Sequence, residues 1–541
     1  MEVPPQREMM RLILGRVRAK GYLGSKEAES ISSRLRIPSS RVYGFASQFD
    51  ELPQHPYRAR VHVCAGPACA ATGSWDLLEV LGEKAPAGVE VRAASGIARA
   101  HRSPAVCLEV AGEGARLLEG MGPEDALALL EALEGKGPPP GRPLEDVPPS
   151  GVEGLSGRGL TPWSAATAEG ALPASWGPEM VRGAGDRPGG VLRRMEGNAE
   201  GAGSGRRGKR GPLTLLCDTV GREAENSASF AVSILHPRAV AAGAALAAAA
   251  CGARELLFYL PWNDVAGDAF ERAAAELLDG VGIRYSFFRG PVQVPCAWDV
   301  GRAAVINGMM LWRAASLYGW SGTRGGDPSL EVLEAEVAWR LPWLAQEGYA
   351  REEGGEDTRL RCLVGRDGTP RFLEVPPGTA MEDLFREMGL EGGSIKAVHA
   401  GGTIAATGTS RAAHDGLPGS CGEAVLLDAA TCMPRWALYQ AWYAERACCG
   451  GCVPGRTAPA AAARLIRGIL RADAGETALE SLASLLAEAG ELALCPRLRE
   501  TLQPVLACLR GFRDEFEAHA NEGVCRSSSC PPAVEAATYG G

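Results

Sequence analysis

The strongest constraint on the fold is the alternation of strand-like and helix-like segments between residues 213 and 290. The runs LTLLC, LLFYLPW and RYSFFRG are typical of strands, and 236–252 and 267–282 are typical of helices. Strands that alternate with helices favour a parallel sheet with helices packed on its faces. The continuously apolar run LLFYLPW predicts a strand that is buried on both sides. We therefore expect an α/β core in this part of the chain.

Length and composition indicate a large multidomain protein. At about one domain per 150 residues, 541 residues predict three or four domains. A net charge of −9 argues against nucleic acid as the main partner. The most apolar helix-like run, 239–251, is too short to cross a bilayer, so we expect no membrane insertion and a cytoplasmic location. In a reducing compartment, the 16 cysteines are more often buried, metal-bound or catalytic than paired in disulfides.

The segments on either side of this core differ in character. A helical lead is followed by strands and helices of a small α/β unit, then by a Pro- and Gly-rich linker. After the core, LRCLV and RFLEV flank Asp367-Gly368, a sequence typical of a hairpin turn, and begin a β-rich module. A helical region and a short tail end the chain. The expected boundaries are 1–48, 49–136, 137–180, 181–352, 353–428, 429–519 and 520–541.

Cys64 and Cys69 form a C-x4-C pair at the end of a predicted strand. Two such thiolates can hold one iron of a [2Fe–2S] cluster, but the second iron needs two more ligands. The motifs GYL at 21–23, VYGFAS at 42–47 and VHVCAGPACAATGS at 61–74 resemble the thioredoxin-like small subunit of the complex I electron-input module. That resemblance places a second cysteine pair at Gly96 and Ala100, and neither residue can bind iron. We expect a thioredoxin-like domain in which Cys64 and Cys69 remain as a residual pair.

A second cysteine cluster begins the helical region, in CCGGCVPGRT at 448–457. A C-x2-C turn at a helix start, together with a distant cysteine, suits a [4Fe–4S] cluster. This region, with DAATCM at 428–433 and FRDEFEAH at 512–519, resembles the helical bundle of the flavin-carrying subunit of complex I and of NAD-linked hydrogenases and formate dehydrogenases. The resemblance implies that Cys449, Cys452 and Cys495 are ligands. The family's remaining cysteine falls on Gly455, and the adjacent Cys448 is the candidate to replace it.

The same resemblance implies a site for flavin mononucleotide (FMN) and NADH, of which only part is present. The best counterpart of the flavin phosphate loop is RGAGDRPGGVLR at 182–193, a Gly-rich run that would bring backbone N–H groups to a phosphate. Its candidate binding residues are Gly183, Gly185, Gly190 and Arg193. Several acidic and asparagine groups that the family uses near the flavin are replaced, as in DVGRAAVIN at 299–307. Their loss argues against FMN binding.

The tail carries a further candidate metal site. Its members are Cys432, His519, Cys525 and Cys530. Zinc prefers four tetrahedral nitrogen and sulfur ligands, although this spacing is loose for such a site. The hydrogenase-type relatives, which this tail resembles, carry a structural zinc near the same junction. The alternative is a frayed tail with two unused thiols.

Taken together, the resemblance implies a fused α/β multidomain chain. Its expected parts are a thioredoxin-like domain, a flavin-subunit-type α/β domain, a β-grasp module of the soluble-ligand-binding type and an iron–sulfur helical bundle. We expect an electron-relay or structural subunit that works with other subunits of an oxidoreductase, with no catalytic residue assigned. The alternative is a divergent FMN-dependent NAD(P)H:acceptor oxidoreductase with a rebuilt nucleotide loop. The sequence leaves open whether the chain is an enzyme.

Overall fold

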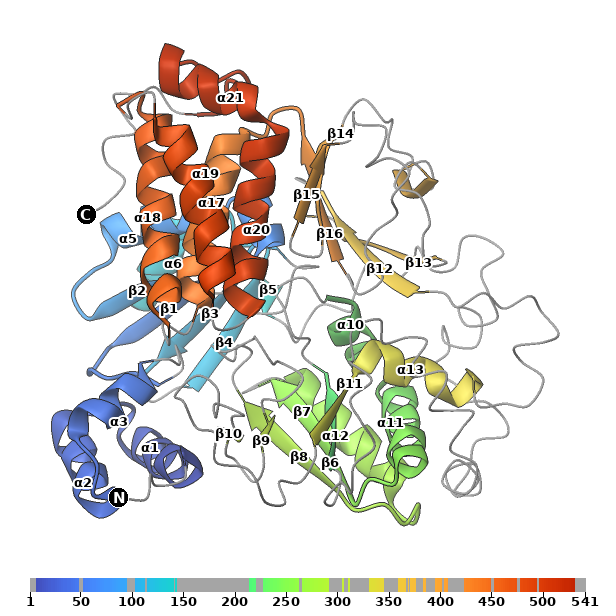
Figure 1. Cartoon of the computed structure of the whole chain (residues 1–541). Coiled ribbons are helices and arrows are strands. Elements are labelled where there is room, and N and C mark those ends of the chain that lie inside the picture. Colours follow the sequence, from blue (N-terminus) through green and yellow to red (C-terminus); the bar gives the residue numbers. More distant parts are fainter. Residues whose placement is uncertain are drawn as a thin grey trace.

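The protein is known from a computed structural model that folds into three main sheets and a C-terminal helical bundle (Figure 1). The predictions made above for 144–213, which include the linker and the candidate flavin loop, lie outside the described residues. The residues that the structure describes are 6–47, 52–94, 103–111, 114–140, 142–143, 214–219, 227–261, 265–290, 304–305, 310–311, 330–344, 359–365, 368, 370–375, 383–385, 395–400, 403–406, 423–448, 452–473, 477–493 and 496–530.

The N-terminal part contains helices followed by a five-stranded sheet of order β2-β1-β3-β4-β5. β1 and β2 run parallel, and β3, β4 and β5 continue the sheet in antiparallel fashion. Leu77 and Leu81 of α5 and Leu129 of α6 share one buried cluster with Val61 and Val63 of β1. The elements are α1 (Gln6–Lys20), α2 (Ser25–Leu35), α3 (Ser39–Ala46), β1 (Ala59–Cys64), α4 (Pro67–Ala71), α5 (Ser74–Lys84), β2 (Val89–Ala94), β3 (Ala105–Val110), β4 (Gly114–Glu119), α6 (Ala126–Leu133) and β5 (Arg142–Pro143).

The central sheet is parallel, as the alternating pattern predicted, and has the order β11-β6-β7-β8. Successive side chains of a strand point to opposite faces, and both faces are buried here. Leu256 and Phe258 of β7 belong to one core, whereas Leu257 and Tyr259 share a cluster with residues of α1–α3. The elements are β6 (Thr214–Asp218), α10 (Ser227–Leu235), α11 (Pro237–Cys251), β7 (Glu255–Pro261), α12 (Val265–Leu278), β8 (Tyr285–Gly290), β11 (Leu330–Glu334) and α13 (Ala335–Leu344), with the short strands β9 (Ala304–Val305) and β10 (Met310–Leu311) forming a separate pair.

The third sheet has the order β13-β12-β16-β14-β15. β12 and β13 form the predicted antiparallel hairpin, and β12 pairs in parallel with β16 at the centre of the sheet. β16 then leads directly into the bundle. The strands are β12 (Arg359–Val364), β13 (Pro370–Val375), β14 (Ile395–Ala400), β15 (Thr403–Ala406) and β16 (Glu423–Asp428).

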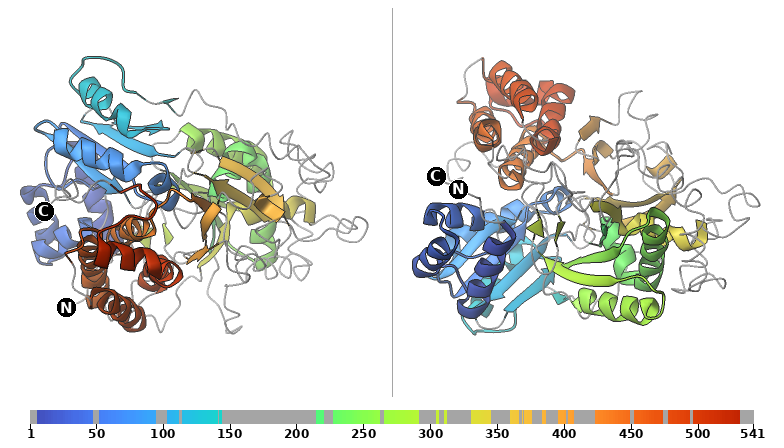
Figure 2. Two further views of the ribbon diagram at one scale, coloured as in Figure 1. Left: turned by 90° about the horizontal axis from the view of Figure 1, so that it is seen from above. Right: turned by 60° about the horizontal axis from the view of Figure 1, so that its bottom comes forward.

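The C-terminal region is a bundle of long helices, with the short helix α21 and the C-terminal tail at one end (Figure 1). Its apolar positions repeat at helical spacing: Leu479, Leu482 and Leu486 of α19 are all buried. Figure 2 shows the bundle lying against the N-terminal part. No helix among the described residues is long and apolar enough to cross a membrane. The helices are α17 (Met433–Ala447), α18 (Val453–Leu470), α19 (Ala478–Leu492), α20 (Pro496–Gly511) and α21 (Arg513–Glu517).

Helices α11 and α13 approach closely at Gly243. A Cβ atom added at this glycine would overlap the carbonyl oxygen of Ala338 in α13. We expect Gly243→Ala to lower the free energy of unfolding by at least about 2 kcal/mol, because the two helix backbones must separate. The matched control is Gly82→Ala in α5, where an added Cβ meets nothing within 4 Å. That control should gain about 0.5–1 kcal/mol from helix propensity. Urea unfolding measures the free energy of unfolding of both variants. Equal values for the two variants would contradict the close packing.

Burial of His236 should make the protein acid-sensitive. His236 is 8% exposed and stacks on Trp339, with ring centroids 5.8 Å apart. Burial lowers its pKa from 6.5 to about 4, so between these values the unfolded chain binds a proton that the folded chain does not. Stability is therefore lost as the pH falls through this window. Between pH 7.5 and pH 5, the wild type should lose about 2 kcal/mol more of its free energy of unfolding than His236→Gln. Urea unfolding at the two pH values measures these losses. Equal losses in the wild type and in His236→Gln would rule out this effect of His236.

Candidate metal centre

Cys432 is held at the junction between the third sheet and the bundle. It is the residue immediately before α17, and Pro434 occupies the first turn of that helix. The turn from β16 is fixed by Thr431, whose backbone N–H and hydroxyl both donate to Asp428, each over 3.0 Å. The side chain of Cys432 is 3% exposed. The sequence DAATCM therefore builds a short turn that places one thiol at a buried helix start.

His519 reaches the same place from the end of the bundle. It lies in a single π-helical turn, Ala518–Glu522, that follows α21. Gly523 ends this turn with φ +65°, a left-handed conformation that glycine adopts without strain. The chain then reverses into the loop that carries Cys525 and Cys530. This reversal brings the tail back onto the bundle.

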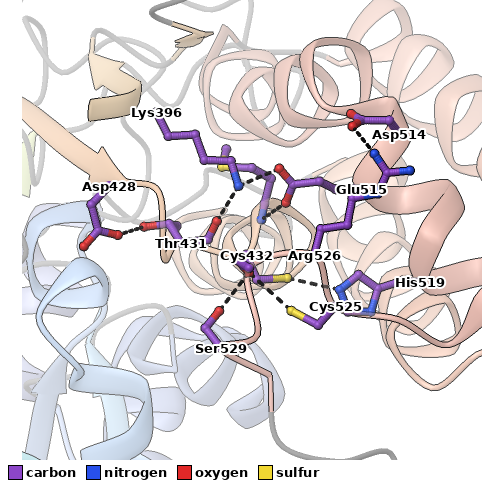
Figure 3. A network of polar contacts seen from close by, with 12 residues as sticks. Lys396, Asp428, Thr431, Cys432, Asp514, Glu515, His519, Cys525, Arg526 and Ser529 are labelled. Carbon is purple, nitrogen blue, oxygen red and sulfur yellow. Dashed lines mark hydrogen bonds and ion pairs between the residues drawn. The ribbon is translucent and has the colours of Figure 1, made fainter. Parts of the chain in front are cut away.

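The structure brings together Cys432, His519, Cys525 and Cys530. Figure 3 shows the first three of them side by side. The four ligand atoms all lie within 4.8 Å of one another, and Cys432 Sγ is 3.3 Å from His519 Nε2. Cys432 and His519 are buried, while Cys525 and Cys530 are partly buried. Tetrahedral zinc–sulfur bonds of about 2.3 Å would place sulfur ligands roughly 4 Å apart. The group therefore has the size of a single-ion site.

A partly buried ion pair holds the residues on both sides of Cys432. Lys396 of β14 approaches Glu515 of α21 to 2.5 Å. The Lys396 ammonium also donates to the carbonyl oxygen of Thr431 over 2.7 Å, and Glu515 accepts the backbone N–H of Met433 over 3.1 Å. The residues before and after the thiol are thus both held, as Figure 3 shows for Thr431. Glu515 also places a negative charge at the start of α17, where the helix dipole favours it.

Local hydrogen bonds prepare one thiol for metal binding. Burial acts to raise the pKa of Cys525, but hydrogen bonds from Ser527 and from the backbone of Ser529 and Cys530 outweigh it and lower the pKa to about 5. A hydrogen bond with Cys530, together with burial, raises the pKa of Cys432. Burial acts to lower the pKa of His519, but its hydrogen bond to Cys432 leaves that pKa raised. Cys525 is therefore a thiolate at neutral pH, whereas Cys432 must lose a proton when it binds metal.

This arrangement suits a structural ion better than catalysis. A site with four protein ligands leaves no open position for substrate or water. A [4Fe–4S] cube also separates its four sulfur ligands further, because each cysteine binds a different iron. The geometry supports a closed site for one ion.

The iron–sulfur candidates in the bundle are only partly described. Cys448 follows the last residue of α17, and its Sγ lies 3.8 Å from Thr501 Oγ1 of α20. Cys452 immediately precedes α18, is buried, and accepts the N–H of Gly455 over 3.3 Å. Cys449 and Cys495 lie outside the described residues, so the complete ligand set stays a prediction.

Cys64 at the end of β1 and Cys69 in α4 lie together and are 3% and 1% exposed. A hydrogen bond between the two thiols, together with burial, raises the pKa of Cys69 well above its usual value. Cys69 also donates to Ser103 Oγ over 3.5 Å. Among the described residues, only the tail group gathers three or more potential ligands. The flavin-loop candidates Gly183, Gly185, Gly190 and Arg193 lie outside the described part of the chain.

Sequence reasoning named the ligand types but missed their supports. Lys396 and Glu515 are isolated charges in segments that gave no motif of their own. Glu515 lies inside FRDEFEAH, four residues before His519, and a helical spacing of four was the one available signal. Nothing in the pattern around Lys396 connected it with Cys432, because the two meet only in the folded chain.

Two family models match separate parts of the chain. Residues 3–107 match the family model of thioredoxin-like [2Fe–2S] ferredoxins. Residues 435–519 match the iron–sulfur binding region of NADH-ubiquinone oxidoreductase-F. The two matches confirm the resemblance that the sequence motifs indicated.

Individual relatives support the same relationship. The chain is 28% identical over 350 residues to the F 2 component of the NADH-quinone oxidoreductase of Rhizobium meliloti (strain 1021), covering 58% of this chain and 82% of that protein. It is 26% identical over 202 residues to HndC, a component of the NADP-reducing hydrogenase of Solidesulfovibrio fructosivorans, covering 35% of this chain but only 40% of HndC. In fold it resembles a chain in the crystal structure of an air-oxidized NAD+-reducing [NiFe]-hydrogenase, with a TM-score of 0.69, 18% identity and coverage of 96% and 94%.

Removal of a ligand should remove the metal. We expect Cys525→Ser and His519→Ala to lower the zinc bound per chain to near zero, because three remaining ligands hold a single ion poorly. The matched control is Cys508→Ala. Cys508 is fully buried in α20, and burial together with nearby Glu515 and Cys432 raises its pKa, but it is not one of the four ligands. Elemental analysis of the purified variants measures zinc and iron. Equal metal content in Cys525→Ser and the wild type would remove this site from consideration.

Proposed function

We propose that this chain, a fused homologue of the thioredoxin-like and flavin-carrying subunits of complex I and NAD-linked hydrogenases, is an electron-relay or structural subunit of a multi-subunit oxidoreductase. Its flavin and [2Fe–2S] sites are eroded, and its one remaining iron–sulfur cluster lies in the helical bundle. Its partners are other subunits of the same complex.

The observation that carries the proposal is the position of Cys448 and Cys452. They lie at the end of α17 and the start of α18, inside the segment that matches an iron–sulfur binding family. Pro496, the residue after Cys495, begins α20, and Thr501 of that helix contacts Cys448. The N–H of Gly455 donates to Cys452 Sγ, and hydrogen bonds to sulfur tune the potential of such clusters. Cys449 and Cys495 complete the proposed ligand set.

The N-terminal site supports loss of the [2Fe–2S] cluster. Such a cluster needs four ligands, and positions 96 and 100 hold glycine and alanine. A hydrogen bond with Cys64 and burial raise the pKa of Cys69, so this thiol would have to lose a proton before it bound iron. Cys64 and Cys69 are proposed to act as a packed thiol pair.

The central sheet supports loss of flavin binding. In open α/β sheets, ligands bind at the carboxyl ends of the strands where the strand order reverses. That point lies between β6 and β11, because β7 and β8 follow β6 on one side whereas β11 is added on its other side. Asp218 and Glu334 are register partners there. In the family element that follows, DVGRAAVIN at 299–307, arginine and alanine stand where the family has carboxylates.

The remaining assignments concern structure. The third sheet has the strand order of a β-grasp, because its first and last strands pair in parallel at the centre, and we assign it to the soluble-ligand-binding type. The centre at Cys432, His519, Cys525 and Cys530 is proposed to hold zinc. A zinc ion there would cross-link the start of α17 to the tail and would supply no redox chemistry.

The proposal predicts the contents of the purified protein. Prepared anaerobically, the chain should carry about four iron atoms in a [4Fe–4S] cluster, one zinc and no flavin. Cys452→Ala should lose the iron and retain the zinc, because the two sites share no ligand. Cys217→Ala, which removes a fully buried thiol in β6, is the control and should keep both metals.

The possible outcomes separate the two functions. Bound flavin that NADH reduces would replace the proposal with the alternative, an FMN-dependent NAD(P)H:acceptor oxidoreductase. The retained parallel sheet and its switch point favour that alternative. A colourless protein without iron would exclude electron relay and leave a structural role. Iron that persists in Cys452→Ala would show that the cluster has been assigned to the wrong residues.

A further inference from the structure

Arg435 joins the tail to a distant part of the chain. It lies in the first turn of α17, three residues after Cys432. Its Nη1 donates to the carbonyl oxygen of Ser529 over 3.2 Å. Its Nη2 approaches Asp76 Oδ1 of α5 to 2.5 Å. One guanidinium therefore contacts both the tail loop and the thioredoxin-like domain.

Aromatic packing surrounds this contact. Trp75, the neighbour of Asp76, stacks on Tyr439 with ring centroids 5.9 Å apart and lies 4.9 Å from Trp442. The Arg435 guanidinium lies 5.5 Å from the Tyr439 ring. Arg435, Tyr439 and Trp442 are spaced by four and three residues, so they share one face of α17. The first turn of α5 thus docks on that face through one ion pair and two ring contacts.

The tail residue that Arg435 contacts, Ser529, is linked to two metal ligands. Ser529 directly precedes Cys530, and its hydroxyl is 3.0 Å from that of Ser527. Ser527 in turn contacts Cys525 Sγ at 3.2 Å. The loop that Arg435 holds is therefore the loop whose shape depends on Cys525 and Cys530 being drawn to one ion. Without that ion, the carbonyl of Ser529 loses the constraint that presents it to Arg435.

We infer that metal binding at the tail and docking of the thioredoxin-like domain on the bundle are coupled through Arg435. The inference rests on the proposed metal centre. An ion bound by the tail holds Ser529 in place, and Ser529 then orients the guanidinium of Arg435. In this orientation the guanidinium forms the ion pair with Asp76. Coupling of this kind is reciprocal. If bound metal strengthens docking by a given factor, docking strengthens metal binding by the same factor.

The chemistry of arginine suits this role. Its planar fork donates in two directions from one rigid group, so fixing one contact orients the other. A lysine ammonium at the same place would keep the charge but lose the fixed geometry. Arg435 is therefore a positioning residue, whose substitution should change the affinity of a site that it does not itself ligate.

The coupling is tested by zinc affinity, measured by chelator competition on the full chain. Asp76→Asn and Arg435→Lys should each weaken zinc binding by about fivefold or more, although neither touches the ion. The zinc affinity of the double variant should equal that of the more severely affected single variant, because both substitutions break the same pathway. Glu480→Gln is the matched control. It removes an ion pair between the exposed side chains of Glu480 and Arg513 at 2.6 Å, which includes no metal ligand, and should leave the affinity unchanged.

Hydrogen exchange of α5 provides a readout that needs no variant. In the wild type, removal of metal should speed exchange in the peptide that covers Ser74–Lys84. In Asp76→Asn the same peptide should exchange fast with or without metal. A wild-type chain that binds no metal would refute the metal centre itself. A chain that binds zinc equally well in all variants, with exchange of α5 independent of metal, would keep the metal centre and overturn the coupling.

Discussion

The ion pair between Lys396 and Glu515 is the contact on which the C-terminal half of the structure depends. A buried charge pair on its own contributes little, because desolvation offsets most of the attraction. Here each charge also binds backbone: Lys396 binds the Thr431 carbonyl and Glu515 binds the Met433 N–H. These extra hydrogen bonds make the pair favourable, and they join β14, the turn before α17 and α21 at one point. Removing Lys396 would leave the buried Glu515 carboxylate without its counter-charge, a situation that costs several kcal/mol.

The sequence predicted most of the elements because their patterns are local. The continuously apolar β7 is buried on both faces, and the Asp-Gly hairpin joins β12 to β13. Strands β4, β11 and β15 were not predicted. GARLLE in β4 has only three apolar residues, and the four residues of β15 are too few for a period to emerge. Their strand form comes from pairing with β3, β6 and β14, which supplies hydrogen bonds that no local sequence encodes.

The candidate site divides in the same way. Cysteine and histidine are recognisable as ligands by residue type, so the sequence named all four members of the tail group. Their convergence could not be read from spacing, because Cys432 is 87 residues from His519. Among the supporting residues, Lys396 and Arg435 carried no signal, and Glu515 carried only its spacing of four residues from His519. Charged residues are common on helices and strands, and nothing distinguishes the one that will be buried beside a thiol until the elements pack.

The chemistry of the sulfur sites limits where electrons could travel. Zinc has no redox chemistry, so a closed zinc centre in the tail could only hold structure. Cys64 and Cys69 form only one pair of thiols, and positions 96 and 100 hold glycine and alanine, so the pair alone cannot supply the four ligands of a [2Fe–2S] cluster. Any electron path through this chain must then use the cluster proposed between α17, α18 and α20. With no flavin beside it, that cluster would have to receive electrons from another protein of the complex. The metal-linked docking of α5 on α17 would matter to such a path, because α17 carries Cys432 and Arg435 near one end and is followed by Cys448 at the other.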